Sequence, residues 1–214
     1  NNDGLPEFGG FNVLPGNTGN SWGGTASGDF DGDGNTDILV NHYSGGVTEI
    51  LYGQGDVDSD GDLDFTVQTF SSYSMMGAAV ADFDGDGDDD FVTSGWSSTA
   101  TLLYTNNGDS NNDGQVEFAV SSIPLTGEQQ NISNQQIADF DGDGDLDFAA
   151  TFGYGDQLVF YNQGDTDNDG DVDFIVDEIA INLSGNRYGS SHGDYDNDGD
   201  IDLVFSGISN NTVF

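Results

Sequence analysis

Acidic residues recur in this chain at a spacing that is typical of cation-binding loops. The segment that begins Asp29-Phe-Asp-Gly-Asp-Gly places carboxylates on alternate residues, and a further carboxylate follows at Asp37. Counted from the first Asp, the carboxylates occupy positions 1, 3, 5 and 9, with Gly at position 6 and a backbone carbonyl available at position 7. Hard oxygen ligands in this number suit calcium, and Gly permits the sharp turn that wraps the ion. We therefore expect such a loop to bind Ca²⁺.

The loop is repeated along the chain in two series. Copies of the first type begin at Asp29, Asp82, Asp139 and Asp194, which are 53, 57 and 55 residues apart. A second, related type runs from Asp56 to Asp64, from Asp109 to Glu117 and from Asp165 to Asp173. A truncated copy with Asn1, Asp3 and Glu7 lacks position 1 and forms at best a partial site. We expect about seven or eight calcium sites.

The predicted ligands are the oxygen-bearing residues at positions 1, 3, 5 and 9 of the seven complete loops. In the first-type loops they are Asp29, Asp31, Asp33, Asp37, Asp82, Asp84, Asp86, Asp90, Asp139, Asp141, Asp143, Asp147, Asp194, Asp196, Asp198 and Asp202. In the second-type loops they are Asp56, Asp58, Asp60, Asp64, Asp109, Asn111, Asp113, Glu117, Asp165, Asp167, Asp169 and Asp173.

These loops share only the first part of the EF-hand pattern. An EF-hand places a bidentate Glu at position 12, whereas the residues here are Val40, Thr93, Ala150 and Phe205. No helical periodicity flanks the loops either. We expect the position-9 carboxylate to serve as the last ligand.

Composition excludes several classes of partner. One Lys or Arg against 40 Asp or Glu gives a formal net charge of -39, which repels nucleic acids and anionic membrane surfaces. Halophilic adaptation would scatter carboxylates over the surface, but here they are clustered in short loops. With 0 Cys there is neither a disulfide framework nor a thiolate zinc site. No apolar run approaches the roughly 18 residues of a transmembrane helix, so we expect no membrane insertion.

The segments between the loops predict an all-β fold. They are rich in β-branched and aromatic residues, as in Ile38-Leu-Val and Leu158-Val-Phe, and Gly, Asn and Ser bound them. Each repeat contains four such segments and two loops, which predicts one four-stranded antiparallel propeller blade with both loops at the same end. The blades comprise approximately residues 20–72, 73–127, 128–184 and 185–214 plus 1–19, within a single domain 1–214.

The two ends of the repeat pattern suggest how the blades close. The chain starts within a second-type loop, runs into a strand over Glu7 to Leu14, and ends on a strand over Asn211 to Phe214. Pairing the N-terminal strand with the C-terminal blade would close a four-bladed β-propeller and remove its free edges. Half of a larger ring, made by two chains, is the alternative.

The repeated Asp-Phe-Asp-Gly-Asp-Gly-x-x-Asp, followed by an apolar strand, resembles the FG-GAP and VCBS repeats of integrin-type propellers and of many bacterial secreted proteins. The resemblance covers nearly the whole chain. It implies a propeller in which calcium is held between adjacent strands of a blade. The chain departs from the family in having four repeats where seven are usual, and in its second-type loops.

We expect a calcium-stabilised extracellular structural or adhesive module, which includes the case of one unit in a tandem array or fibre. Its partners would be other copies of the chain or neighbouring domains. A lectin-like module that binds glycans through Tyr43, Trp96 and Tyr154 is the alternative. An accessory domain of a polysaccharide-processing enzyme has less support, because His42, His192 and Arg187 are the only His and Arg residues. We expect His192 to be a packed inner-strand residue and His42 to lie in a surface loop, and we predict no catalytic residue.

Overall fold

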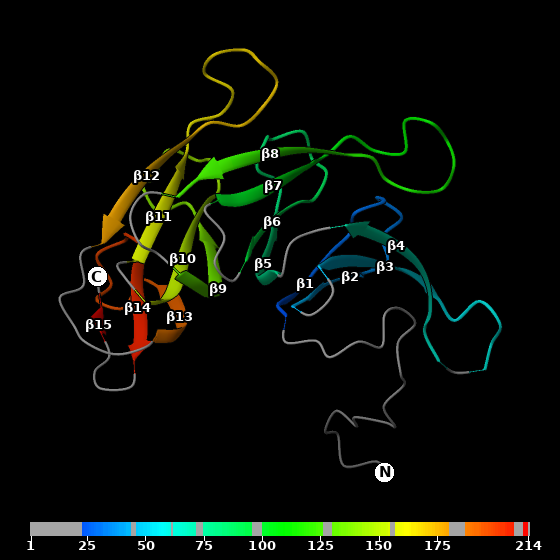
Figure 1. Ribbon diagram of the computed structural model, residues 1–214, viewed down its shortest axis with the longest axis horizontal. Coiled ribbons are helices and arrows are strands. Elements are labelled where there is room, and N and C mark those ends of the chain that lie inside the picture. The colour runs from blue at the N-terminus through cyan, green and yellow to red at the C-terminus, as the bar shows by residue number, and fades with distance from the viewer. Residues whose placement is uncertain are drawn as a thin grey trace, which may run out of the picture.

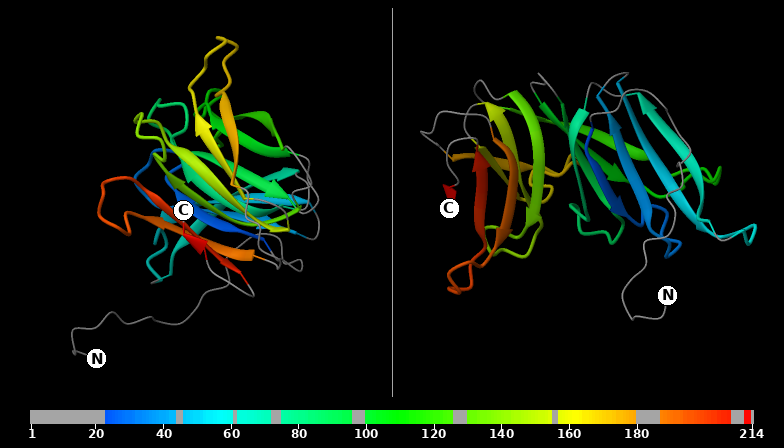
Figure 2. Two further views of the ribbon diagram at one scale, coloured as in Figure 1. Left: turned by 90° about the vertical axis from the view of Figure 1, so that its left-hand side faces the viewer. Right: turned by 90° about the horizontal axis from the view of Figure 1, so that it is seen from below.

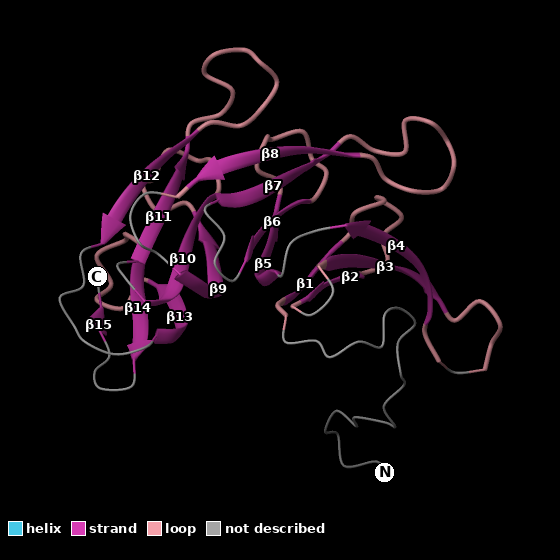
Figure 3. Cartoon of the chain, viewed as in Figure 1, coloured by secondary structure: helices cyan, strands magenta, loops and turns pink. Residues whose placement is uncertain are grey.

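The computed structural model describes residues 23–43, 46–60, 62–71, 75–95, 100–125, 130–154, 157–179, 187–207 and 212–213. These residues form β-strands connected by loops and turns (Figures 1 and 3). In this described part of the chain, no helix is long and apolar enough to cross a membrane. The predicted all-β class is confirmed.

The strands form four antiparallel sheets, each from consecutive segments of the chain. Sheet I contains β1 (Thr25–Gly28), β2 (Asp37–His42), β3 (Val47–Gly55) and β4 (Asp64–Ser71). Sheet II contains β5 (Met75–Ala81), β6 (Asp90–Gly95), β7 (Ala100–Asn106) and β8 (Phe118–Pro124). Sheet III contains β9 (Gln130–Ala138), β10 (Asp147–Tyr154), β11 (Gln157–Asn162) and β12 (Phe174–Ile179). Sheet IV contains β13 (Arg187–Gly193), β14 (Asp202–Gly207) and β15 (Thr212–Val213).

Strand order within each sheet follows chain order, as expected for propeller blades. The first-type loop joins the first strand of a sheet to the second, and the second-type loop joins the third strand to the fourth. Because successive strands of a meander alternate in direction, both connections fall at the same end of the sheet. The Asp-rich loops therefore share one end of each sheet, and the right-hand view of Figure 2 shows the first-type loops on one side of the molecule.

The sheets pack against one another in chain order through their first two strands. β5 packs on β1 and β2, β9 packs on β5 and β6, and β13 packs on β9 and β10. The described elements form an arc with sheets I and IV at its two ends (Figure 1). The predicted closing strand over residues 7–14 lies outside the described residues, so the structure supports blades of the predicted kind without demonstrating a closed ring.

The two central strands of each interior sheet are buried on both faces, which explains their continuous apolar sequences. In β6, Phe91 packs into the core shared with sheet I, and Val92 packs into the core shared with sheet III. Both side chains are 0% exposed. Successive side chains of a strand point to opposite faces, so the apolar pair serves two interfaces at once.

A repeated aromatic arrangement fills the interface at the loop end. Phe91 and Tyr104, neighbours on β6 and β7, are stacked with their ring centroids 4.3 Å apart. Phe30, from the first-type loop of sheet I, meets Phe91 edge-on at 5.8 Å and Phe118 at 6.1 Å. The offset and edge-on geometries are those that aromatic quadrupoles favour.

The next interface repeats this arrangement residue for residue. Phe148 and Phe160 are stacked at 4.2 Å, and Phe83 meets Phe148 edge-on at 6.0 Å. The aromatic side chain at loop position 2 of one sheet therefore packs into the aromatic cluster of the next sheet.

Buried hydrogen bonds join the sheets again, toward the strand ends that lie away from the first-type loops. Each bond satisfies polar groups that would be costly to bury alone. They run from Asn41 Nδ2 to the Gly77 carbonyl (2.8 Å), from Gln135 Nε2 to Ser94 Oγ (2.9 Å) and from Thr151 Oγ1 to Ser190 Oγ (2.7 Å).

The interface aromatics should dominate stability. We predict that Phe148→Ala lowers the free energy of unfolding by about 3–5 kcal/mol, because it leaves a cavity in a core that joins two sheets. Val120, which is 55% exposed on β8, provides the matched control, and Val120→Ala should change stability by less than about 0.5 kcal/mol. Urea unfolding in calcium-containing buffer measures both. Equal effects of the two substitutions would contradict this assignment of the core.

Candidate metal-binding loops

The Asp-rich loops share one backbone conformation. Position 4 has a positive φ between 58° and 78° in all seven complete loops. The residues there are Gly32, Ser59, Gly85, Asn112, Gly142, Asn168 and Asn197. Position 6 is Gly with φ between 84° and 105° in the six loops where it is described. The left-handed region explains Gly, Asn or Ser at position 4, and φ near 100° requires Gly at position 6.

Backbone amides of the loop orient the first carboxylate. Asp82 accepts hydrogen bonds from the amides of Gly85 (2.8 Å) and Gly87 (3.1 Å). In a second-type loop, Asp109 accepts from the amides of Asp113 (3.0 Å) and Gly114 (2.9 Å). The loop thus curls around its own position-1 side chain. Both loop types therefore adopt the same turn, although first-type loops join the first two strands of a sheet and second-type loops join the last two.

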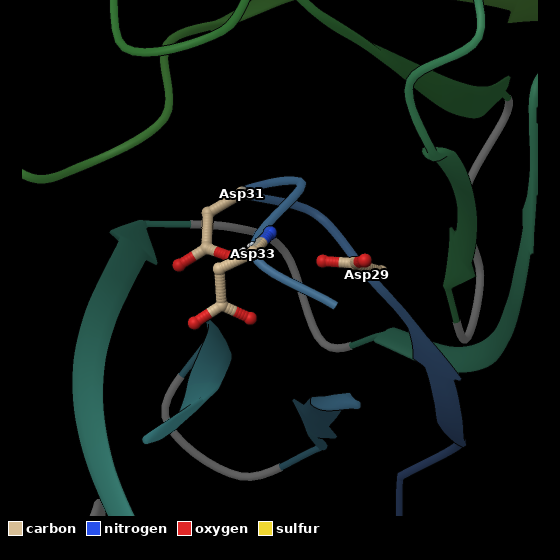
Figure 4. A group of neighbouring side chains, drawn as sticks. All are labelled: Asp29, Asp31 and Asp33. Atoms are coloured by element: carbon tan, nitrogen blue, oxygen red, sulfur yellow. Dashed lines mark hydrogen bonds between the residues drawn. The ribbon is translucent and has the colours of Figure 1, made fainter. Parts of the chain in front are cut away.

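This turn brings the carboxylates together. Seven groups of acidic residues place one ligand oxygen each within 4.8 Å of the others. They include Asp29, Asp31 and Asp33; Asp56, Asp58 and Asp64; Asp82, Asp84 and Asp86; Asp109, Asp113 and Glu117; and Asp139, Asp141 and Asp147. In Figure 4, Asp29 reaches from the end of β1 toward Asp31 and Asp33. The structure thus brings together these predicted residues as groups that could hold ions.

The clustered charges lack a basic partner. The whole chain has a single Lys or Arg, so 40 acidic residues have almost no cationic side chains to offset them. Burial, and then the charges of Asp33 and Asp29, raise the pKa of Asp31. Asp84 behaves in the same way beside Asp86 and Asp82, with burial again the largest cause. A divalent cation would relieve the repulsion between these carboxylates.

A buried oxygen of Asp29 that lacks a hydrogen-bond partner indicates whether the loop could hold a cation. Asp29 Oδ2 accepts a hydrogen bond from the Gly34 amide at 3.0 Å, but Asp29 Oδ1 is buried without any hydrogen-bond partner. A buried carboxylate oxygen without a partner is costly. Asp29 belongs to a convergent group with Asp31 and Asp33, and a calcium ion held by these three residues would give its carboxylate the missing partner. The residues present therefore fit the ion.

The position-9 carboxylate has a role that sequence reasoning missed. In sheet II, Asp90 is 0% exposed and accepts hydrogen bonds from the amides of Phe83 and Asn106, both at 2.8 Å. Asp37 accepts in the same way from Phe30 and Gly53, again at 2.8 Å. Position 9 thus ties position 2 of its loop to the third strand of its sheet. The signal for this role is the apolar strand that begins directly after the Asp, at Ile38 and Phe91, which predicts a carboxylate at the edge of the core.

The second-type loops use position 9 in a related way. Glu117 accepts a hydrogen bond from the Ser110 amide at 2.7 Å, and Asp64 accepts from the Val57 amide at 2.9 Å. Position 9 also belongs to the acidic groups at Asp64, Glu117 and Asp147. These carboxylates face the group of ligands and hold the loop closed at the same time.

The remaining candidate residues lie apart from the loops or outside the described ranges. His42 was expected in a surface loop, but it ends β2, is 3% exposed and lies 2.8 Å from Glu49 Oε2, so that prediction is wrong. His192 lies on the inner strand β13 as expected, but it is exposed; its ring meets Phe140 edge-on, and Nδ1 lies 3.1 Å from Gln136 Oε1. Trp96 and the partial N-terminal loop fall outside the described residues.

Repeated acidic loops between the strands of consecutive meanders define a class of β-repeat protein whose blades could bind metal ions. Residues 82–150 match the FG-GAP-like repeat family. The matched region spans two first-type loops and the strands β6 to β10. No curated protein matches the chain. The chain thus carries FG-GAP-like repeat sequence with several Asp-rich triads, which confirms the predicted resemblance.

Burial of position 9 makes the ion-free protein sensitive to pH. Burial raises the pKa of Asp90 to about 7 and that of Asp37 to about 6, although hydrogen bonds from backbone amides oppose the shift. A group whose pKa is raised by folding stabilises the folded state when it is protonated, and this contribution is lost as pH rises through the folded-state pKa.

We therefore predict that the ion-free protein becomes less stable between about pH 5 and about pH 8. Thermal unfolding in chelator, repeated across this range, measures the trend. Asp90→Asn should weaken the pH dependence, because the substituted amide does not titrate. A transition temperature that rises with pH in chelator would contradict the prediction.

Proposed function

We propose that this chain is a calcium-stabilised extracellular structural or adhesive module of the β-propeller type. The observation that carries the proposal is the recurrence of one loop geometry seven times, each with a group of carboxylates and no basic side chain to balance it. The orphaned Asp29 Oδ1 supports a cation as the missing partner. The match to the FG-GAP-like repeat family supports the propeller architecture.

Calcium fits the donor set better than the other common cations. All donors are oxygens, which excludes soft thiolate sites, and the chain contains 0 Cys. Flexible turns with several carboxylates suit the six to eight irregular ligands of calcium better than the strict octahedron of magnesium. The ion would be held by carboxylates from positions 1, 3, 5 and 9, and position 9 would also close the loop. Bound there, it supplies charge neutralisation and a cross-link within the turn.

The stabilisation from such ions would be large in sum. If each loop has a dissociation constant of roughly 0.1–1 mM, as in extracellular calcium modules, millimolar calcium contributes about 1 kcal/mol per site. Seven sites would then rival the net stability of an ordinary domain, which is roughly 5–15 kcal/mol. Sites this weak would be filled outside cells rather than in cytosol. With affinities in this range, the proposal includes an extracellular or cell-surface location.

The proposal includes ring closure by the N-terminal segment. Sheet IV has three strands among the described residues, whereas sheets I to III have four. The outer edge of β15 is where the strand predicted over residues 7–14 would pair. Because the chain contains 0 Cys, Val213→Cys combined in turn with a single Cys substitution at each of residues 7–14 would report this contact without competing thiols. Failure of every pair to cross-link in a monomer would favour a larger ring made by two chains.

The distribution of charge and sites supports a structural or adhesive role. The ion loops share one end of each sheet and account for most of the acidic residues, so their chemistry is committed to the fold. Partners would be other copies of the chain or neighbouring domains. No structural observation favours the glycan-binding alternative. Of the aromatic residues predicted for it, Trp96 lies outside the described residues and only the backbone of Tyr154 is described.

Chelation provides the direct test. We predict that removing calcium lowers the thermal transition of the protein by at least about 15 °C, because several ions that bind only the folded state are lost. Differential scanning calorimetry with chelator, followed by calcium readdition, measures the loss and its recovery. Magnesium at equal concentration is the control and should restore less of the transition. A transition that is indifferent to chelator would contradict the proposed function.

A further inference from the structure

Two buried asparagines lie where the ion loops of neighbouring sheets meet. Asn106, the last residue of β7, is 1% exposed. Its Nδ2 donates to the Phe30 carbonyl at 2.8 Å and to the Asp89 carbonyl at 3.1 Å, and its Oδ1 accepts from the Gly108 amide at 2.9 Å. Two donors and one acceptor are all engaged, so the side chain has a single fixed orientation.

The three partners of Asn106 belong to three different loops. Phe30 is position 2 of the first-type loop in sheet I, between Asp29 and Asp31. Asp89 is position 8 of the first-type loop in sheet II, and Gly108 directly precedes the second-type loop of that sheet. One side chain thus fixes the backbone of three ion loops, one of which belongs to the neighbouring sheet.

Asn162 repeats the arrangement one sheet further along. It is 0% exposed, and its Nδ2 donates to the Phe83 carbonyl at 2.7 Å and to the Leu146 carbonyl at 3.2 Å. Its Oδ1 accepts from the Gly164 amide at 2.9 Å, directly before the second-type loop of sheet III. Both asparagines contact the loop 82–90, which therefore belongs both to the three loops joined by Asn106 and to the three joined by Asn162. Five loops are connected in this way: 29–37, 82–90, 109–117, 139–147 and 165–173.

A further contact strengthens the link between sheets I and II. Asp89 Oδ2 accepts a hydrogen bond from the Asp29 amide at 2.8 Å. A Cβ at Gly28 would lie 2.6 Å from this same oxygen, so the small residue makes room for it. Asp89, near the end of the loop 82–90, thus binds the amide of Asp29 directly. Through Asn106 it is also linked to the carbonyl of Phe30, the next residue of the loop 29–37.

Sheet I lacks the connecting side chain. The residue that corresponds to Asn106 is Gly53, whose amide bonds to Asp37 just as the Asn106 amide bonds to Asp90. A Cβ at Gly53 would lie 2.6 Å from the Thr36 carbonyl oxygen, so this position excludes a side chain. The second-type loop 56–64 therefore has no side-chain link of this kind, and it provides a control within the same molecule.

The geometry points to coupled ion binding: Asn106 and Asn162 are positioning residues that join five loops into one cooperative set. The inference rests on the proposed function, because it concerns how the loops bind calcium. An ion that orders one first-type loop fixes the backbone carbonyl at position 8 of that loop. This carbonyl accepts a hydrogen bond from the asparagine and so fixes its side chain. The same side chain then fixes the carbonyl at position 2 of the preceding first-type loop, between the ligands at positions 1 and 3. The second ion then meets a loop that is already ordered, which costs less conformational entropy.

Residue-resolved calcium titration of the full chain tests this inference. Amide signals of Gly34, Gly87 and Gly114 report three linked loops, and the amide of Asp62 reports the loop 56–64. In the parent protein the three glycines should share one calcium midpoint, and Asp62 should titrate separately. In Asn106→Ala the midpoint at Gly34 should rise by at least about fivefold, the lower end of typical coupling, with little change at Asp62.

The neighbouring Asn107 offers a matched control. It is exposed, and its side chain makes only a local 3.3 Å bond to the Thr105 carbonyl, so Asn107→Ala should leave every midpoint unchanged. If Asn106→Ala does not fold, Asn106→Ser and the parent titration supply the test. Separate midpoints for the three glycines in the parent, or equal midpoints in parent and folded variant, would overturn the coupling alone. No calcium-dependent shift at any of these amides would overturn the proposed function and the coupling with it.

Discussion

Repulsion between carboxylates is the constraint on which the rest of this structure depends. Each loop gathers several acidic side chains in one turn, and the turn is held by its own amides, as in the bonds from Gly85 and Gly87 to Asp82. These bonds orient the carboxylates but leave their net charge in place. With a formal net charge of -39, the chain has too few basic side chains to neutralise its loops, and the proposed calcium ions would supply the balance. The β-sheets and their aromatic interfaces are then the framework that keeps seven such turns in position.

Much of this framework could be predicted from the sequence, for identifiable physical reasons. The loop spacing carries its own geometry, because Gly at position 6 and Gly, Asn or Ser at position 4 are the residues that tolerate positive φ. The alternation of loops and apolar segments predicts four strands and two loops per blade, and sheets I to III have this topology.

The parts that could not be predicted depend on contacts between residues that are separated along the chain. Nothing local distinguishes Asn106 from its neighbour Asn107, yet one is buried among three loops and the other is exposed. His42 follows an apolar strand and reads as the start of a turn, but it is buried beside Glu49. The double role of position 9 was missed for the same reason, since the amide that donates to Asp90 belongs to Asn106, on the next strand of the same sheet. Periodicity predicts which residues are buried, but it does not identify their partners.

The two kinds of bond between sheets have a mechanical consequence. Each interior interface has an aromatic core, with Asn106 or Asn162 bonded across it at the loop end, and a second buried bond such as Asn41 to Gly77 nearer the other end. Two separated hydrogen-bonded attachment points prevent one sheet from sliding or pivoting on the next, whereas an apolar interface alone would permit such movement. A force directed along the strands would load both attachments and the interlocked rings in shear at the same moment. Sheets I to III should therefore resist traction as one stiff body rather than peel apart sheet by sheet.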